Sequence, residues 1–112
     1  PWGDEEITLM HCNYNYELGK TTPVGQYEQD VSPYGAYDMA GNVAEWCHDC
    51  YAYNYGDGAP DSNPKGPESG RKRVLHGGSW MNDEEMCRTF HRNYLSPDSR
   101  SRNIGFRLAC DS

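Results

Sequence analysis

Two carboxylates, Asp38 and Glu45, flank a Gly-Asn turn in the segment YDMAGNVAEW and stand seven residues apart. A loop of this length can fold back so that both side chains point at one spot, where backbone carbonyls of the turn complete a cage of oxygen atoms. Ca²⁺ prefers such a set of hard oxygen ligands. The alternative is that Asp38 caps a turn and Glu45 is a solvated strand residue, and spacing alone favours this alternative.

A second candidate is the stretch 81–103 (MNDEEMCRTFHRNYLSPDSRSRN), which follows the segment RVLHGGSW. Arg88, Arg92 and Arg100 can hold a loop by hydrogen bonds to carbonyls and carboxylates. The residues between them mix adaptable polar groups with aromatic residues, a composition typical of protein-binding loops. An ordinary solvated loop has the same composition, and composition alone favours it. Ser79 lacks the flanking pattern of a nucleophile elbow, so we interpret it as a turn hydroxyl.

The odd number of cysteines leaves at least one thiol without an intramolecular partner. Many pairings are possible, and the sequence selects none of them. Cys47 and Cys50 form a CxxC motif, but no second close pair accompanies it for zinc, and no βαβ pattern surrounds it for a thioredoxin-like site. We therefore expect disulfides, together with an unpaired cysteine that is able to link copies of the chain. The five residues are Cys12, Cys47, Cys50, Cys87 and Cys110.

The composition excludes two classes of partner. With 10 basic and 17 acidic residues, the net charge of −7 argues against a nucleic-acid-binding protein. No stretch approaches the roughly 20 apolar residues that span a bilayer. The charge is uneven: residues 1–70 hold 2 basic and 12 acidic side chains, whereas residues 71–112 hold 8 basic and 5 acidic side chains.

The chain begins at Pro1 in the middle of a motif, as expected of a processed or trimmed product, so a missing leader says nothing about secretion.

The elements that position these residues are short. At 112 residues we expect one small domain over 1–112, with a modest core that needs metal or disulfides to stabilise it. Apolar residues do not recur with a helical period, and glycine and proline interrupt the whole chain. The pattern predicts strands at 22–27, 43–46, 73–76 and 105–109, a polar loop at 56–70, one or two helical turns within 83–91, and a long loop at 92–103.

The segments PWGD, CNY, TPVG, YDMAGNVAEWC, RVLHGGSW and NIGFRLA occur in this order. Together they resemble the formylglycine-generating enzyme (sulfatase-modifying factor) family over nearly the whole chain. The resemblance implies an α+β, C-type-lectin-like fold with little regular secondary structure, short antiparallel strands and long loops. The usual family domain is longer, and this chain resembles its C-terminal part.

The resemblance also implies structural calcium, which reverses the preference from spacing alone. The implied ligands are the side chains of Asp38 and Glu45 and the backbone carbonyls of Gly41 and Val43. A second family site would use the Asn13 side chain and the Tyr14 carbonyl. The remaining ligands of that second site fall where this sequence is shortened, between residues 16 and 20.

The family's enzyme oxidises a substrate cysteine with copper held by two cysteines. Aligned from Gly77, the second of these positions falls on Cys87 and the first falls on Asn82. Cu(I) is a soft ion that favours paired thiolates, whereas an amide is a hard and neutral ligand. The resemblance therefore implies an inherited fold without copper and without the oxidase activity.

The C-terminal third resembles the variable proteins of diversity-generating retroelements, which use the same lectin-like fold. In those proteins, residues 81–103 would correspond to a stretch with many asparagine codons. Many residues here are Tyr, Ser, Asp or His, the types reached when the adenines of an asparagine codon are replaced, whereas Met81 and Met86 are not. The resemblance implies a ligand-binding face. Its residues are Trp80, Met81, Asn82, Asp83, Met86, Phe90, His91, Asn93, Tyr94, Leu95, Ser96, Ser99, Ser101 and Arg102.

The leading hypothesis is a non-catalytic module that binds a protein ligand or surface receptor outside the cell or at its surface. One alternative is a metal-dependent oxidoreductase of the family, in which Cys87 is catalytic and binds metal with His91 at i+4 on one helical face. A further alternative is a structural subunit of an extracellular assembly.

Overall fold

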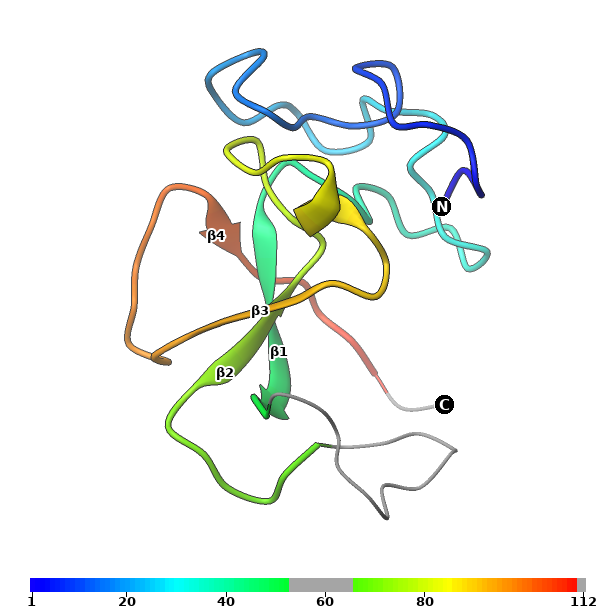
Figure 1. Ribbon diagram of the computed structural model, residues 1–112. Helices are drawn as coiled ribbons and strands as arrows, with labels where there is room; N and C mark the ends of the chain where they lie inside the picture. The colour runs from blue at the N-terminus through cyan, green and yellow to red at the C-terminus, as the bar shows by residue number, and fades with distance from the viewer. Residues whose placement is uncertain (53–65, 111–112) are drawn as a thin grey trace.

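The computed structural model describes residues 1–52 and 66–110 (Figure 1). None of the helical structure in these residues is long or apolar enough to span a bilayer. Most of the loop predicted at 56–70 lies outside the described residues. The elements are the strands β1 (Ala44–Cys50), β2 (Arg73–His76), β3 (Arg92–Leu95) and β4 (Ile104–Gly105) and one 3-10 turn, η1 (Glu85–Cys87).

The strands form one sheet in the order β3-β2-β1-β4. β2 pairs antiparallel with both β1 and β3, whereas β4 runs parallel to β1 and places Gly105 opposite Glu45. Val74 and Leu75 are consecutive residues of β2 and are each 2% exposed. Since successive side chains of a strand point to opposite faces, both faces of the sheet are covered at β2.

The prediction of secondary structure is confirmed in part. The strand at 73–76 is found with its predicted bounds, and the strand predicted at 43–46 is found as the longer β1. The strand predicted at 105–109 shortens to β4, and 22–27 forms no strand because its backbone turns at Gly25, where φ is +80°.

Residues 92–103 differ from the predicted long loop, since their first four residues form β3. β3 exists because it pairs with β2 along its whole length, with Val74 opposite Tyr94. This pairing joins residues about 20 positions apart and has no local signal. The helical turn expected within 83–91 is found as η1.

Residues 1–43 contribute no strand to the sheet and cover one end of it (Figure 1). Backbone hydrogen bonds attach them: Asn42 N donates to the Asn13 carbonyl at 2.8 Å, and Asn15 N donates to the Asn82 carbonyl at 2.7 Å. Gly41 has a φ of +67°, and a Cβ there would lie 2.4 Å from the Asn13 carbonyl oxygen. Only glycine therefore permits this close approach of two backbones.

Beside the sheet lies a small core at the junction of the N-terminal segment and η1. It consists of Cys12, Ala40 and Cys87, all buried. Half-buried residues complete it from the N-terminal side: Trp2, Ile7 and Tyr14. The core joins elements from both ends of the chain, and it borders the candidate sites described below.

Candidate functional site

The predicted calcium loop borders a cavity of about 200 Å³. Asp38 and Asn42 adopt positive φ angles of 55° and 60°, which turn the loop back on itself. Asp and Asn tolerate this conformation better than most residues. The Oδ2 atom of Asp38 accepts a hydrogen bond from Gly25 N at 2.9 Å. All four predicted ligand residues line the cavity: Asp38, Gly41, Val43 and Glu45.

Arg107 lines the same cavity and binds the second carboxylate. Its Nε donates to Glu45 Oε2 at 2.6 Å, and its Nη2 donates to Glu45 Oε1 at 2.8 Å. Further bonds run from Nη2 to the Asp38 carbonyl at 2.7 Å and from Nη1 to the Tyr37 carbonyl at 3.0 Å. The bond to Glu45 raises the pKa of the Arg107 guanidinium. Because each carboxylate oxygen has two lone pairs, the Glu45 carboxylate keeps acceptor capacity for a cation.

Two buried oxygens at the predicted metal positions have no hydrogen-bond partner within the described residues. They are Asp38 Oδ1 and Asn13 Oδ1. Buried polar atoms rarely stay unpaired, so each of these two oxygens is a candidate ligand for a cation. The Nδ2 of Asn13 donates to the Lys20 carbonyl at 2.8 Å, which fixes the direction of its Oδ1. Tyr14, the other residue of the second predicted site, is half-buried beside it.

The described part of the chain contains no group of three or more His, Cys, Asp or Glu side chains placed to hold a metal ion. A calcium site here would therefore depend on carbonyl and amide oxygens in addition to carboxylates. The ligand set implied by the sequence has this mixed character. The residues of the 38–45 loop thus fit Ca²⁺ by their chemistry, by the shared cavity and by the unpaired oxygen of Asp38.

Asn82, which the sequence comparison from Gly77 places at the first copper cysteine of the family's enzyme, is hydrogen-bonded to the scaffold. Its Oδ1 accepts a hydrogen bond from the Ser79 hydroxyl at 2.7 Å. Ser79 is fully buried, and its Oγ accepts in turn from Asn103 Nδ2 at 3.0 Å. This use of the side chain departs from the prediction that Asn82 contacts a ligand, because its oxygen is already bonded inside the protein.

Cys87, which the same comparison places at the second copper position, lies in one buried cluster with Cys12. The two side chains are 6% and 0% exposed. The interaction of the two thiols lowers the pKa of Cys87, while the same interaction and burial raise the pKa of Cys12. The sequence did not reveal the pair, since residues 75 positions apart carry no local signal of contact.

The alternative metal pair of Cys87 and His91 is not supported. It required both residues on one helical face, but η1 ends at Cys87 and Arg88 is extended, with a ψ of 144°. Side chains four residues apart do not share a face once the backbone leaves the helix. The prediction that Cys87 and His91 bind one metal ion from a shared helical face is therefore wrong.

The aromatic residues of the predicted binding face differ in exposure. Trp80 is 4% exposed, its Nε1 donates to the Arg102 carbonyl at 3.4 Å, and the Tyr16 ring meets it edge-on at 5.5 Å. The prediction that Trp80 contacts a ligand does not fit this burial, because its ring is part of the interior. Phe90, by contrast, is 74% exposed.

The other predicted contact residues lie on η1, on the edge strand β3 and on the loop that follows. Asp83 Oδ1 accepts from the backbone N–H groups of Glu85 and Met86, so this side chain also starts η1. The Tyr94 ring lies over Tyr51 with 4.1 Å between centroids. Exposed members are Asp83, Phe90, Tyr94, Ser101 and Arg102, and half-buried members are Met81, Asn82, Met86, His91, Asn93, Leu95, Ser96 and Ser99.

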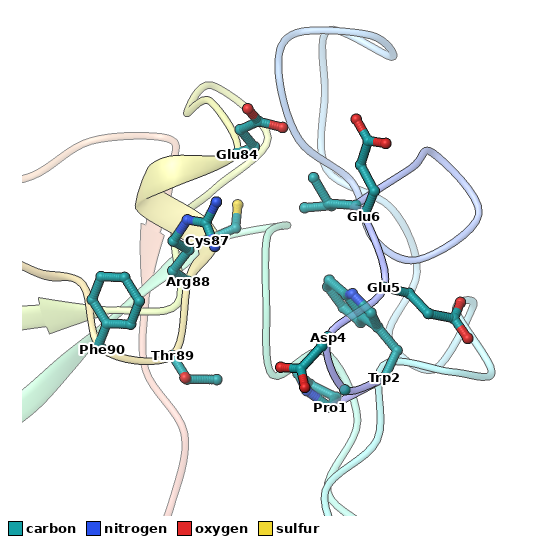
Figure 2. A pocket seen from close by; sticks show the side chains of 12 residues that line it. Pro1, Trp2, Asp4, Glu5, Glu6, Glu84, Cys87, Arg88, Thr89 and Phe90 are labelled. Carbon is teal, nitrogen blue, oxygen red and sulfur yellow. The ribbon is translucent and has the colours of Figure 1, made fainter.

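A cleft of about 460 Å³ separates residues 1–7 from residues 84–90 (Figure 2). Four of its side chains are acidic: Asp4, Glu5, Glu6 and Glu84. Cys87 lines the cleft and points from η1 toward the N-terminal segment. Phe90 lines both this cleft and a second cavity of about 330 Å³. The most exposed aromatic residue of the predicted face thus stands between two hollows.

The family model of the sulfatase-modifying factor enzyme 1-like domain matches residues 2–112. The chain belongs to this family. Its relatives within the family include proteins of different kinds, so membership by itself does not separate an enzyme from a binding module.

Three relatives of this sulfatase-modifying factor domain illustrate the range. Serine/threonine-protein kinase pkn1 of Chlamydia caviae is 43% identical over 111 residues, covering 97% of this chain and 17% of that protein. The formylglycine-generating enzyme of Streptomyces coelicolor is 39% identical over 127 residues, which cover 99% of this chain and 40% of that enzyme. The structure of Treponema denticola variable protein 1 matches with a TM-score of 0.73 and 40% identity, covering 88% of this chain and 35% of that chain.

These matches confirm the predicted fold class and both resemblances, to the enzyme family and to a variable protein. One detail of the fold differs from expectation, since the pairing of β1 with β4 is parallel. The chain spans between 17% and 40% of the lengths of these relatives.

Proposed function

We propose that this sulfatase-modifying factor domain is a non-catalytic module that binds a protein ligand on a calcium-stabilised scaffold. The observation that carries the proposal is the position of Asn82. Its side-chain oxygen is bonded to the buried Ser79 hydroxyl, so position 82 supports the loop after β2 and offers no thiolate for copper. The chemistry that the family's enzyme performs needs both cysteines at this place.

Calcium would stabilise the loop that faces β4. The carboxylates of Asp38 and Glu45 and the carbonyls of Gly41 and Val43 would hold it, and its charge would offset two carboxylates that share one cavity. The unpaired Oδ1 of Asp38 supports this role. The second predicted site, at Asn13, has the same kind of support from its unpaired Oδ1.

The binding face consists of the exposed members of the predicted set, with Phe90 as the aromatic anchor. Polar side chains with a few exposed aromatic residues form protein-binding loops in other proteins. The similarity to Treponema denticola variable protein 1 supports a face whose residues change while the scaffold stays. An extracellular or cell-surface location is part of the proposal.

A library of variants randomised at exposed positions tests the proposed binding face. Randomising Phe90, Tyr94, Ser101 and Arg102 should leave the melting temperature within about 3 °C in most members, because exposed side chains contribute little to stability. Displayed on phage, the library should yield binders to a purified protein target. Randomising Ser79, Trp80 and Asn82 is the matched control and should abolish folding in most members. Equal loss of folding in both libraries contradicts the proposed face.

An oxidation assay tests the absence of catalysis. The reduced protein is loaded with Cu(I), supplied with oxygen and a cysteine-containing peptide, and assayed for a peptide aldehyde by mass spectrometry. We expect no aldehyde. Aldehyde formation that disappears in Cys87→Ala contradicts the proposal.

An oxidoreductase is the second candidate, and the adjacency of Cys12 and Cys87 is the observation that favours it. Two neighbouring thiols are suited to a soft metal ion. Dialysis of the copper-loaded protein against a weak chelator distinguishes the two functions. Retention of one copper ion per chain supports the oxidoreductase, and complete loss supports the binding module.

A further inference from the structure

The buried thiol pair lies where two parts of the chain meet. Cys12 belongs to the N-terminal segment that contributes no strand, and Cys87 is the last residue of η1. Both side chains belong to one buried core cluster with Ala40, and each thiol shifts the pKa of the other. The other three cysteines lie elsewhere, with Cys47 and Cys50 on β1 and Cys110 beyond β4.

The surroundings keep Cys87 in position. A Cβ on Gly78 would lie 2.7 Å from the Cys87 sulfur, so the backbone after β2 packs directly on this side chain. Cys87 N donates to the Glu84 carbonyl at 3.1 Å within η1. The Gly78 backbone and the η1 bond therefore restrict Cys87, and Cys12 lies in the same buried cluster.

We propose that Cys12 and Cys87 form a disulfide in an oxidising environment, which covalently fastens the N-terminal segment to the loop after β2. The cross-link would add to backbone bonds that already attach this segment there, from Asn15 N to the Asn82 carbonyl and from Tyr16 N to the Trp80 carbonyl, both 2.7 Å. The cross-link would close a loop between residues 75 positions apart, and long loops lose the most chain entropy on closure.

A small-molecule disulfide such as oxidised glutathione supplies the oxidising equivalents. Cys87 lines the cleft and reacts first: its thiolate attacks one sulfur of glutathione disulfide, that S–S bond breaks, and one glutathione leaves. The Cys12 sulfur then attacks the Cys87 sulfur, the mixed S–S bond breaks, and the second glutathione leaves as a thiol that carries the Cys12 proton. Two protein thiols are oxidised by two electrons, and one glutathione disulfide is reduced to two thiols.

The cross-link also bears on the lost oxidase chemistry. Cys87 occupies the copper position that this chain retains, and a sulfur bound in a disulfide is no longer a thiolate ligand. The oxidised form would therefore hold neither of the two thiolates that copper needs.

Peptide mapping tests the pairing. The protein is equilibrated in a glutathione redox buffer, its free thiols are alkylated, and it is digested with trypsin. The cleavage sites place Cys12, Cys87 and Cys110 on separate peptides and leave Cys47 and Cys50 together on another. We expect the peptide ending at Lys20 to be linked to the peptide of residues 74–88. Cys12 linked to any other cysteine, or alkylated after equilibration with an excess of oxidised glutathione, overturns the proposal.

Thermal unfolding provides a second measurement. Oxidation should raise the melting temperature by about 10 °C over the dithiothreitol-treated protein. The matched control Cys110→Ser should keep this difference, and Cys12→Ala should lose it. If Cys12→Ala does not fold, the melting temperatures of the oxidised and the reduced wild-type protein still test whether the disulfide stabilises the fold. A melting temperature that is unchanged or lower on oxidation overturns the proposal.

Discussion

Arg107 and Glu45 form an ion pair with two hydrogen bonds, Nε to Oε2 at 2.6 Å and Nη2 to Oε1 at 2.8 Å, although they lie 62 residues apart. The parallel pairing of β4 with β1 brings them together, since Gly105 lies opposite Glu45. The same guanidinium bonds the carbonyls of Tyr37 and Asp38. The Arg107 side chain thus joins the segment after β4 to both ends of the 38–45 loop.

Replacing Arg107 by lysine should lower the free energy of unfolding by about 2 kcal/mol, because a lysine ammonium cannot reproduce the paired bonds to Glu45 or the bonds to the two carbonyls. Urea unfolding measures the change. The control Arg88→Lys should cost less than about 0.5 kcal/mol, since Arg88 pairs with Glu85 in solvent, with side chains 51% and 61% exposed. Equal effects of the two substitutions would show that the Arg107 pair has no special role.

Calcium should stabilise the wild-type protein and not Asp38→Ala. At a calcium concentration about 100-fold above the dissociation constant, we expect a gain of about 3 kcal/mol over the protein in a chelator. Thermal unfolding with calcium and with chelator measures this difference. The control Asp4→Ala removes an exposed carboxylate outside the loop and should keep the full calcium effect. The same melting temperature with calcium and with chelator in the wild type would rule out the site.

Trp80→Ala should destabilise the protein by about 3–5 kcal/mol, because it removes a large buried ring. Phe90→Ala is the matched aromatic substitution at an exposed position and should change stability by less than about 0.5 kcal/mol. Denaturant unfolding of the two variants side by side provides the measurement. A large loss of stability in Phe90→Ala would place this ring in the core and remove it from the binding face.

Stability should depend on pH through Asp30, a fully buried carboxyl. Burial raises its pKa from 3.8 to about 6, against the opposing effect of the hydrogen bond from Ala40 N. Between these two values the folded state binds the proton more tightly than the unfolded state does. The contribution of Asp30 is therefore complete below about pH 4 and is lost as the pH rises through about 6.

The variant Asp30→Asn isolates this effect. Measured in a chelator between pH 4 and 7, the free energy of unfolding of the wild type should fall relative to that of Asp30→Asn as the pH rises. Comparison with the variant cancels the groups that titrate in both proteins. Parallel pH profiles for the two proteins would contradict the predicted titration of Asp30.

The sequence by itself determined the family, the turn within residues 38–45 and the strand at 73–76. These features are local: each motif is an uninterrupted segment, and turn residues such as Gly41 and Asn42 adopt their conformations from their own backbone chemistry. The correspondence of Asn82 with a copper cysteine also came from the sequence alone and stays a prediction.

Only the tertiary structure decided which distant residues meet. The pairs Arg107 with Glu45 and Cys12 with Cys87 join segments 62 and 75 positions apart, and the buried Trp80 ring contacts Tyr16 from the N-terminal segment. No periodicity or spacing reports such contacts. They form because burial and hydrogen bonding across the whole chain together outweigh the chain entropy that loop closure loses.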